Sequence, residues 1–353
     1  MNLDLLLQCM QLEDASDLHL AVGCVPVFRV HGVLRELPQC AESAHAECIR
    51  EVVLAALGEG AWQKLEREQE LDAAFSGPGG IRLRLNGYKE ENGFALAIRF
   101  LPNAFFALQD LGLPLRVLED CCRMQSGLVL VTGSTGSGKS TTIASLVHRI
   151  NQERACHIHT IEDPIEYRHT PIRAFVTQRE VGRDTVSFAE ALRRSLRQDP
   201  DVIVVGEMRD LDTMSAALTL AETGHLTFAT LHTSDAAQTI SRVISAFPAA
   251  QQAQVRVQLA STLRVIISQK LLPCAPKPGR KLAAEVLVAT PSVRAMIREE
   301  KTHQLQTALQ TGGEHGMQTL NQSILRLVNE GHIPRATALE YAEDKAGLAQ
   351  QMR

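Results

Sequence analysis

The residues with the clearest chemistry form one continuous loop that fits the pattern G-x-x-x-x-G-K-[ST]. The loop and the residue after it are Gly133, Ser134, Thr135, Gly136, Ser137, Gly138, Lys139, Ser140 and Thr141. An apolar segment before the loop predicts a strand, and the helical pattern that begins at Lys139 supplies the context that supports such a match. In a loop of this kind backbone N–H groups surround the β-phosphate, the lysine reaches the β- and γ-phosphates, and the serine hydroxyl ligates Mg²⁺. The loop therefore predicts a nucleoside triphosphate and Mg²⁺ as ligands; the alternative is a surface loop rich in glycine and serine.

Polar residues follow three further predicted strands. Glu162 and Glu166 come after "HIHTI", Glu207 comes after "VIVV", and His232 comes after "LTFATL". In open α/β sheets ligands bind beyond the carboxyl ends of the strands, so we expect these side chains at one edge. We predict that Glu207 orients water or acts as a general base, because a purely structural carboxylate at the end of an apolar strand would be costly to bury. Glu162 and Glu166 are predicted to hold Mg²⁺ or its waters, and His232 to contact the γ-phosphate; solvated carboxylates and a hydrogen-bonded core histidine are the alternatives.

A second histidine, His225, lies on the other side of the same predicted strand. It lies seven positions before His232, which is about 23 Å along an extended chain. The two side chains therefore cannot share a metal ion on a straight strand. We expect His225 to be structural or to act across a subunit boundary.

The elements that must position these residues fall into two parts. Residues 1–100 predict a mixed α and β domain, and "GGIRLRLNGY" alternates so that Arg82 and Arg84 share the exposed face of a strand. Residues 101–114, with two prolines, an asparagine and a glycine, predict an interdomain connection that packs against the protein. Strands alternate with helices in residues 115–353, including helices at about 188–198 and 211–222, which predicts a parallel sheet covered on both faces.

Composition excludes several classes of function. The chain has 353 residues, of which 45% are hydrophobic and 22% charged, and a formal net charge of −4. A net negative charge gives no sign of the basic surface that nucleic-acid-binding proteins use. No apolar run approaches the ~20 residues that span a bilayer, and the acidic N-terminal segment is a poor signal peptide, so we expect a cytoplasmic protein that meets membranes only through partners. The eight cysteines include no C-x-x-C pair, which argues against a structural zinc site and favours scattered reduced thiols.

Five segments, in this order and at this spacing, resemble the type II/type IV secretion ATPases. They are "GSTGSGKSTT", "TIEDPIEY", "QREVGRDT", "LRQDPDVIVVGEMRD" and "AETGHLTFATLHT". "ASDLHL" near the start and "SVRAMIRE" near the end resemble the retraction branch, the twitching-motility ATPases of the PilT family. The resemblance covers nearly the whole chain.

The resemblance implies an α/β fold, an N-terminal PAS-like α+β domain followed by a RecA-like P-loop ATPase domain, assembled as a homo-hexamer. It implies ATP with Mg²⁺ as the cofactors, and it implies a catalytic role for Glu207, Glu162, Glu166, His232 and His225. Ser140 and Glu207 would bind Mg²⁺ together with the nucleotide. Arg82, Arg84 and Arg99 match arginines of the family that approach the phosphates. The expected partner is a pilus platform protein at the cytoplasmic face of the inner membrane.

Two segments decide between branches of the family. Extension and secretion ATPases usually carry a four-cysteine zinc module, whereas "KLLPCAPKPGRK" holds Cys274 alone, which favours retraction. The retraction helix of the family commonly reads AIRNLIRE, and this chain keeps Arg294, Ile297, Arg298 and Glu299, which the resemblance assigns to motor coupling. An ordinary packing helix is the alternative.

One segment departs from the family pattern. "YKEENG" places Glu90 and Glu91 where an arginine is common, which leaves open an accessory retraction ATPase paralogue or a regulatory partner that does not hydrolyse ATP. Within the same family, an assembly or secretion ATPase also stays open, and a nucleic-acid-driven motor is disfavoured by the acidic balance.

Overall fold

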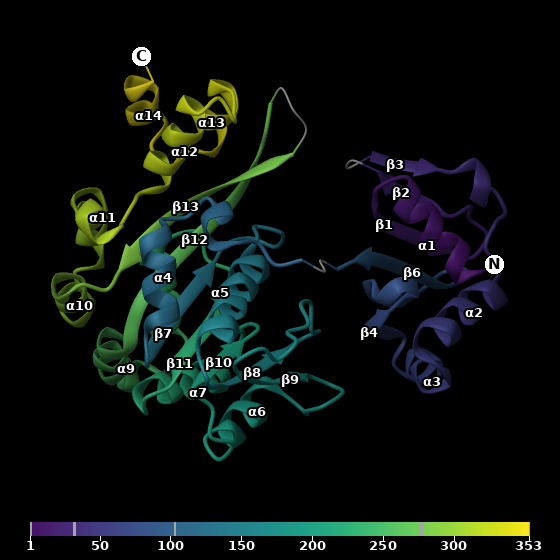
Figure 1. Cartoon of the computed structure of the whole chain (residues 1–353), viewed down its shortest axis with the longest axis horizontal. Coiled ribbons are helices and arrows are strands. Elements are labelled where there is room, and N and C mark those ends of the chain that lie inside the picture. The colour runs from purple at the N-terminus through teal and green to yellow at the C-terminus, as the bar shows by residue number, and fades with distance from the viewer. Residues whose placement is uncertain (1, 31–32, 102–103, 276–278, 353) are drawn as a thin grey trace. The chain divides into compact units, whose positions relative to one another are not determined.

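The computed structural model describes residues 2–30, 33–101, 104–275 and 279–352, which form two compact units. The N-terminal unit comprises Met1–Ala104 together with Pro164–Arg168, and the second unit comprises Phe105–Asp163 with His169–Arg353 (Figure 1). The chain leaves the first unit inside the predicted connection 101–114, of which residues 102 and 103 lie outside the described part. The segment Pro164–Arg168 belongs to the first unit although the sequence surrounds it with residues of the second.

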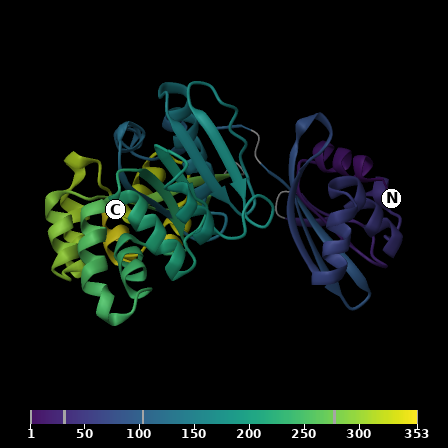
Figure 2. The ribbon, with the colours of Figure 1, turned by 90° about the horizontal axis from the view of Figure 1, so that it is seen from below.

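The N-terminal unit is an antiparallel sheet with helices packed on one of its faces (Figure 2). The strand order is β3-β2-β1-β6-β5-β4. The strands are β1 (Ala15–Ala21), β2 (Val27–Val30), β3 (Val33–Glu36), β4 (Glu70–Ser76), β5 (Arg82–Glu90) and β6 (Gly93–Phe100). The helices are α1 (Leu3–Leu12), α2 (Ala46–Leu57) and α3 (Glu59–Glu68). Alternate strand residues such as Leu18, Leu83, Leu85 and Ile98 are fully buried beneath these helices.

The opposite face of this sheet carries a row of charged side chains. Arg29, Asp17, Arg99 and Arg84 occupy paired positions on four neighbouring strands. The predicted alternation along β5 is therefore correct, since Leu83 and Leu85 are buried on the helical side. The prediction that Arg82 is exposed is wrong: only 5% of its surface is accessible, because the segment Pro164–Arg168 packs in this unit and the Ile165 carbonyl accepts a hydrogen bond from Arg82 Nη2 at 3.1 Å.

The second unit is built on a sheet with the order β13-β12-β7-β11-β10-β8-β9, in which every pair is parallel except β12 with β13. The strands are β7 (Gly127–Thr132), β8 (His157–Glu162), β9 (Phe175–Glu180), β10 (Val202–Val205), β11 (Leu226–Leu231), β12 (Leu263–Pro273) and β13 (Arg280–Val288). The central strands β7, β10 and β11 are buried along their whole length, as expected for a sheet covered on both faces. The predicted parallel sheet is confirmed.

Helices cover both faces of this sheet. Alternate residues of a strand point to opposite faces, as β7 shows. Val129 and Val131 of β7 pack with α4 (Leu115–Arg123) and α5 (Lys139–Glu153). Leu128 and Leu130 pack in a second core cluster that includes α6 (Phe188–Ser195), α7 (Leu211–Glu222), α8 (Ala236–Ser245) and α9 (Ala249–Thr262). Three leucines of the predicted connection, Leu108, Leu111 and Leu113, are buried in the same cluster as Val129 and Val131, around the short helix Leu108–Leu111.

The chain ends in a group of small helices beside the β12–β13 edge (Figure 1). They are α10 (Pro291–Arg298), α11 (Leu305–Thr311), α12 (Leu320–Asn329), α13 (Arg335–Tyr341) and α14 (Lys345–Gln351). Helices α12 to α14 enclose their own small core with Leu272 and Ala283 of the hairpin. Among the described residues, no helix combines the length and the apolar character needed to cross a bilayer.

Candidate nucleotide-binding and hydrolytic site

The predicted phosphate loop joins the end of β7 to the start of α5. Gly133, Gly136 and Gly138 all have positive φ angles, between 76° and 138°, which glycine adopts without strain. A Cβ at Gly133 would also overlap the carbonyl oxygen of Gln269 on β12. The loop therefore needs glycine at this position for close packing as well as for its conformation.

Lys139 holds the loop in its present shape. Its ammonium group donates to the carbonyl oxygens of Gly133 and Ser134, each at 2.9 Å, and the residue is buried. An ammonium group in this position faces the concave side of a loop whose N–H groups lie at a helix N-terminus, which is a ready site for a phosphate. The lysine is the cation that this loop offers to a nucleotide.

Glu207 lies beyond the end of β10, and the structure brings it next to His232. Its Oε1 lies 3.3 Å from His232 Nε2, and its Oε2 lies 2.8 Å from Arg209 Nη2. The backbone around it is tied to β11, because Met208 N donates to the Thr230 carbonyl at 3.0 Å and Thr230 Oγ1 donates to the Gly206 carbonyl. Glu207 is 22% exposed and borders a cavity of about 570 Å³ that Arg209 and Arg242 also line. A carboxylate so placed can orient a water molecule once its ion pairs open.

Glu162 ends β8, next to β10 in the sheet, so it occupies the same carboxyl edge as Glu207. Its Oε1 accepts hydrogen bonds from Thr160 Oγ1 at 2.6 Å and from Gln178 Nε2 at 3.2 Å. Gly206 lies so close to the end of β8 that a Cβ there would come within 3.2 Å of the Ile161 carbonyl oxygen. Close packing of the two strand ends positions the two carboxylates on one edge.

The two histidines lie at opposite ends of β11. His225 precedes the strand, and its carbonyl accepts from Gly127 N at the start of β7, at the end of the sheet away from the phosphate loop. Its Nδ1 lies 3.0 Å from the Leu220 carbonyl oxygen. The structure therefore does not bring His225 to the edge that carries Glu207 and His232, and a catalytic role for it stays a prediction from the resemblance.

Glu166 and the three predicted arginines belong to the N-terminal unit. Arg84 donates to both carboxylate oxygens of Asp72, at 2.8 Å from its Nε, and Arg99 Nε donates to Asp17 Oδ1 at 2.6 Å. Burial raises the pKa of Asp17, but hydrogen bonds from Ser16 and Arg99 outweigh it and lower the pKa of Asp17 overall. Any role of Arg84 and Arg99 toward a phosphate therefore requires them to exchange these carboxylate partners.

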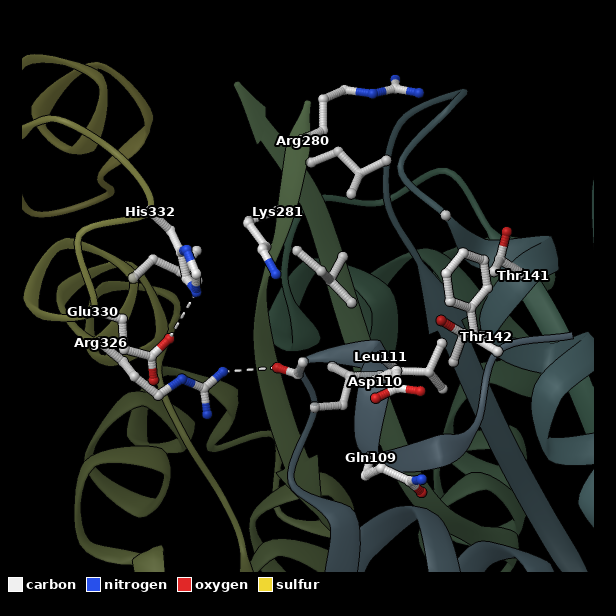
Figure 3. A pocket seen from close by; sticks show the side chains of 17 residues that line it. Gln109, Asp110, Leu111, Thr141, Thr142, Arg280, Lys281, Arg326, Glu330 and His332 are labelled. Atoms are coloured by element: carbon white, nitrogen blue, oxygen red, sulfur yellow. Dashed lines mark hydrogen bonds and ion pairs between the residues drawn. The ribbon is translucent and has the colours of Figure 1, made fainter. Parts of the chain in front are cut away.

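A cavity of about 550 Å³ opens beside the start of α5 (Figure 3). Thr141 and Thr142 of α5 border one side, and the apolar side chains of Leu111, Leu271 and Leu282 also line it. Polar and ionisable side chains line it as well, among them Asp110, Arg280, Lys281, Arg326, Glu330 and His332. Its volume is within the range of small-ligand pockets, and Gly138 and Thr141, at the end of the phosphate loop, are among its lining residues.

Apart from Gly138 and Thr141 of the predicted loop, the residues of this cavity were not predicted from the sequence. Most of them come from the segment before α4, from the β12–β13 hairpin, and from α12 and the residues after it, which are far apart along the chain. Arg326 joins two of these segments, since its Nη2 donates to the Gly112 carbonyl at 2.7 Å (Figure 3). No local sequence pattern indicates that these segments come together; the signal that the sequence offers is the basic pair Arg280 and Lys281, at the start of β13.

The residues of the site fit Mg²⁺ held largely by phosphate oxygens and water. Ser140 supplies a hydroxyl directly after Lys139, and Glu207 supplies a carboxylate at the same sheet edge. Among the described residues, no cluster of three or more histidine, cysteine, aspartate or glutamate side chains could hold a metal by itself. Mg²⁺ commonly keeps its waters and binds through one or two protein ligands plus substrate phosphates, so this donor set is adequate.

The predicted motor-coupling residues lie on α10, away from the loop. Val293 and Ile297 are fully buried and Met296 packs against the same core, which confirms the amphipathic face. Thr290 caps the helix, accepting from Val293 N at 3.4 Å. The side chains on the polar face of the helix differ in how exposed they are.

On that polar face Arg294 is half-buried and donates to the Ala289 carbonyl at 3.0 Å, whereas Arg298 is exposed. Glu299 pairs with Lys301 at 2.7 Å, and this hydrogen bond lowers the pKa of Glu299. Packing thus accounts for one face of the helix, and Arg298 is available on the other.

Comparison with known proteins gives consistent matches over the full length of the chain. A family model described as "Type II/IV secretion system protein" matches residues 2–337. The chain is 44% identical over 334 residues to the "Type IV pilus retractation ATPase PilT" of Pseudomonas aeruginosa, covering 94% of this chain and 95% of that protein. It is 41% identical over 328 residues to a "Twitching motility protein" of Neisseria gonorrhoeae, covering 92% and 86%. A solved structure described as "Crystal Structure of the Pilus Retraction Motor PilT and Bound ADP" has a TM-score of 0.91 at 42% identity and covers 99% of both chains.

Proposed function

The chain belongs to the type II/IV secretion system protein family, and we propose that it is an ATP-hydrolysing motor that powers retraction of type IV pili in twitching motility. It is a P-loop ATPase of α/β fold, with an N-terminal α+β unit followed by a RecA-like unit, as the sequence predicted. The observation that carries the proposal is the edge shared by the phosphate loop, Glu207 and His232, within a chain that resembles a retraction motor along 99% of its length.

The proposed reaction begins with exchange of partners at Lys139. The phosphates of ATP take the place of the Gly133 and Ser134 carbonyl oxygens that now accept from this lysine. Its charge then lies against the β- and γ-phosphates, and the N–H groups of the loop add further donors. Mg²⁺, held by Ser140 and the phosphates with Glu207 nearby, would neutralise charge on the phosphates.

Glu207 orients the attacking water in this proposal. Its carboxylate must first leave Arg209, which lies 2.8 Å away, and that arginine then faces the cavity beside the site. His232 remains within 3.3 Å of the carboxylate and reports the state of the γ-phosphate to the loop that follows β11. Glu162 holds the neighbouring strand end and binds waters around the metal.

The cavity beside α5 receives the sugar and base of the nucleotide in this proposal. Thr141 stands next to the loop, and the apolar side chains of Leu111, Leu271 and Leu282 offer a surface on which a base can pack. Arg326 links the wall of this cavity to the segment before α4. A nucleotide in the cavity would therefore contact residues of the C-terminal helices as well as the phosphate loop.

The proposed assembly is a ring of six copies at the cytoplasmic face of the inner membrane. Arg82, Arg84 and Arg99 would approach the phosphates within that ring, and Glu166 would act on the waters of the metal. The ring would grip a platform protein of the pilus machinery and meet the membrane only through such partners. These roles come from the family resemblance, and the similarity to a solved retraction motor supports them.

An accessory retraction ATPase is the second candidate. The β5–β6 hairpin carries Glu90 at the end of β5 and Glu91 in the turn, where the family commonly has an arginine. An acidic turn would weaken one approach to the phosphates and leave this chain dependent on another motor for full activity.

Deletion of the gene distinguishes a retraction motor from an assembly motor. A retraction motor removes pili from the surface, so we expect cells that lack this chain to carry excess surface pili and to lose twitching. Electron microscopy of the cells gives the pilus count. Loss of pili would indicate an assembly motor instead, and an unchanged count with weakened twitching would indicate the accessory role.

Replacement of Arg298 by alanine tests the coupling role of α10. Arg298 is exposed and lies outside the site, so we expect Arg298→Ala to keep the six-subunit ring and most ATP turnover but to stop twitching. Arg294 is a less selective target, because its hydrogen bond to the Ala289 carbonyl also supports the fold.

The matched control is Arg123→Ala on α4, which removes another exposed arginine near a helix end. Light scattering, phosphate release and twitching zones are compared for both variants. If ATP turnover falls in step with twitching in Arg298→Ala, the helix serves the catalytic fold and the coupling role is wrong.

A further inference from the structure

A row of buried polar side chains runs across three neighbouring strands beneath the site. Thr132 of β7, Ser268 of β12 and Glu285 of β13 occupy paired positions, and each is at most 2% exposed. Thr132 Oγ1 donates to Ser268 Oγ at 2.9 Å. Thr132 is the residue directly before the phosphate loop, so the row starts at the root of that loop.

The far end of the row meets α8, the helix that follows His232. The carboxylate oxygen Oε1 of Glu285 accepts a hydrogen bond from Ala236 N at 2.8 Å. Ala236 is the first residue of α8 and is buried, so its N–H has no partner within the helix and needs one from elsewhere. Three residues separate it from His232, which pairs with Glu207.

We propose that Glu285 is a positioning residue for ATP hydrolysis, which holds the loop between His232 and α8 through its bond to Ala236 N. The inference rests on the proposed ATP hydrolysis at Glu207 and extends it to a residue that touches neither the nucleotide nor the water. The row from Thr132 to Glu285 ties the root of the phosphate loop and the His232 loop to the same strands.

The charges that face Glu285 come from three elements. Asp235 caps α8, Glu343 precedes α14, and Lys270 lies on β12. Burial raises the pKa of Glu285 to about 7, opposed by the Ala236 hydrogen bond and by Lys270, and reinforced by Glu343 and Asp235. Burial also raises the pKa of Glu343. Glu285 thus changes charge near neutral pH.

The ionised carboxylate is the stronger acceptor for the Ala236 N–H and the better partner for the N-terminus of α8. We therefore expect kcat to rise as pH increases through about 7, where Glu285 loses its proton. KM for ATP should stay nearly constant, because Glu285 is not among the described residues that line the cavity beside α5, and its carboxylate accepts from Ala236 N at the start of α8. A group that only supports the fold would not separate kcat from KM in this way.

The test measures kcat and KM of the full chain against pH for wild type, Glu285→Gln and Glu285→Ala. Glu285→Gln keeps an acceptor oxygen but cannot ionise, so we expect it to lose the rise near pH 7 and to retain the lower kcat of the acid side. Glu285→Ala should lower kcat further, about tenfold, since it leaves the Ala236 N–H buried without a partner. Glu343→Gln is the matched control; it removes a neighbouring negative charge and should move the rise to lower pH without abolishing it.

The thermal unfolding of the same proteins gives a second readout. Because folding raises the pKa of Glu285 above its ordinary value of 4.5, the folded chain binds this proton more tightly than the unfolded chain. The free energy of unfolding should therefore fall as pH rises from about 4.5 to about 7 in wild type, and fall less in Glu285→Gln.

If Glu285→Gln keeps the wild-type kcat and the rise near pH 7, the positioning role is overturned. If Glu285→Ala does not fold, Glu285→Gln alone decides, since it retains the size and the acceptor. Lys139→Ala is measured alongside. Undiminished turnover in Lys139→Ala would reject the proposed hydrolytic site itself, whereas failure of the Glu285 variants alone rejects only this inference.

Discussion

Lys139→Ala is expected to abolish ATP turnover. The ammonium group is the cation that faces the inside of the phosphate loop, and it makes two hydrogen bonds of 2.9 Å to loop carbonyls that phosphate oxygens would replace. Each hydrogen bond to a charged group contributes about 1.5–3 kcal/mol, so loss of two weakens ATP binding by roughly 100-fold or more. Phosphate release and binding of a fluorescent ATP analogue measure the two effects.

Lys64→Ala is the matched control for that experiment. Lys64 lies on α3 of the N-terminal unit and makes only a 3.9 Å ion pair with Glu68, so its loss should change neither binding nor turnover. Circular dichroism should report the same helix content in both variants. Turnover that survives in Lys139→Ala would contradict the assignment of the loop.

Glu207→Gln is expected to bind ATP but to lose turnover by about 10²–10⁴-fold, the usual contribution of a positioned general base. The amide keeps the size of the carboxylate and can still accept from Arg209, which now lies 2.8 Å away. It lacks the negative charge that draws a proton from water. Binding should be preserved because Lys139 and the loop are untouched.

The control for this variant removes a carboxylate of the same kind outside the site. Glu222 ends α7 and accepts from Gln258 Nε2 at 2.7 Å, so Glu222→Gln should hydrolyse ATP normally. Single-turnover assays with excess enzyme separate binding from hydrolysis. A Glu207→Gln protein that releases phosphate at the wild-type rate would show that another residue activates the water.

Sequence patterns predicted most of the second unit, because its signals are local. The helix predicted at 211–222 is α7, Leu211–Glu222, and the phosphate loop begins and ends where the pattern places it. The helix predicted at 188–198 ends three residues early, at Ser195. Asp199 has a φ of 52° and precedes Pro200, which is incompatible with a continuing helix.

Features that depend on distant segments were not predictable in this way. Arg82 is buried because a segment from far along the chain, Pro164–Arg168, packs in the N-terminal unit. The cavity beside α5 and the polar row that ends at Glu285 each combine residues from three or more elements. Periodicity shows which face of an element is buried, but it does not show which distant residue will lie against that face.

The central claim is that hydrolysis at Glu207 powers pilus retraction. The most direct measurement is live imaging of labelled pili in cells whose only copy of this chain carries Glu207→Gln. We expect these cells to extend pili and to fail to withdraw them, while cells with the wild-type chain or with Glu222→Gln withdraw them normally. Withdrawal at the wild-type rate and frequency in the Glu207→Gln cells would contradict it.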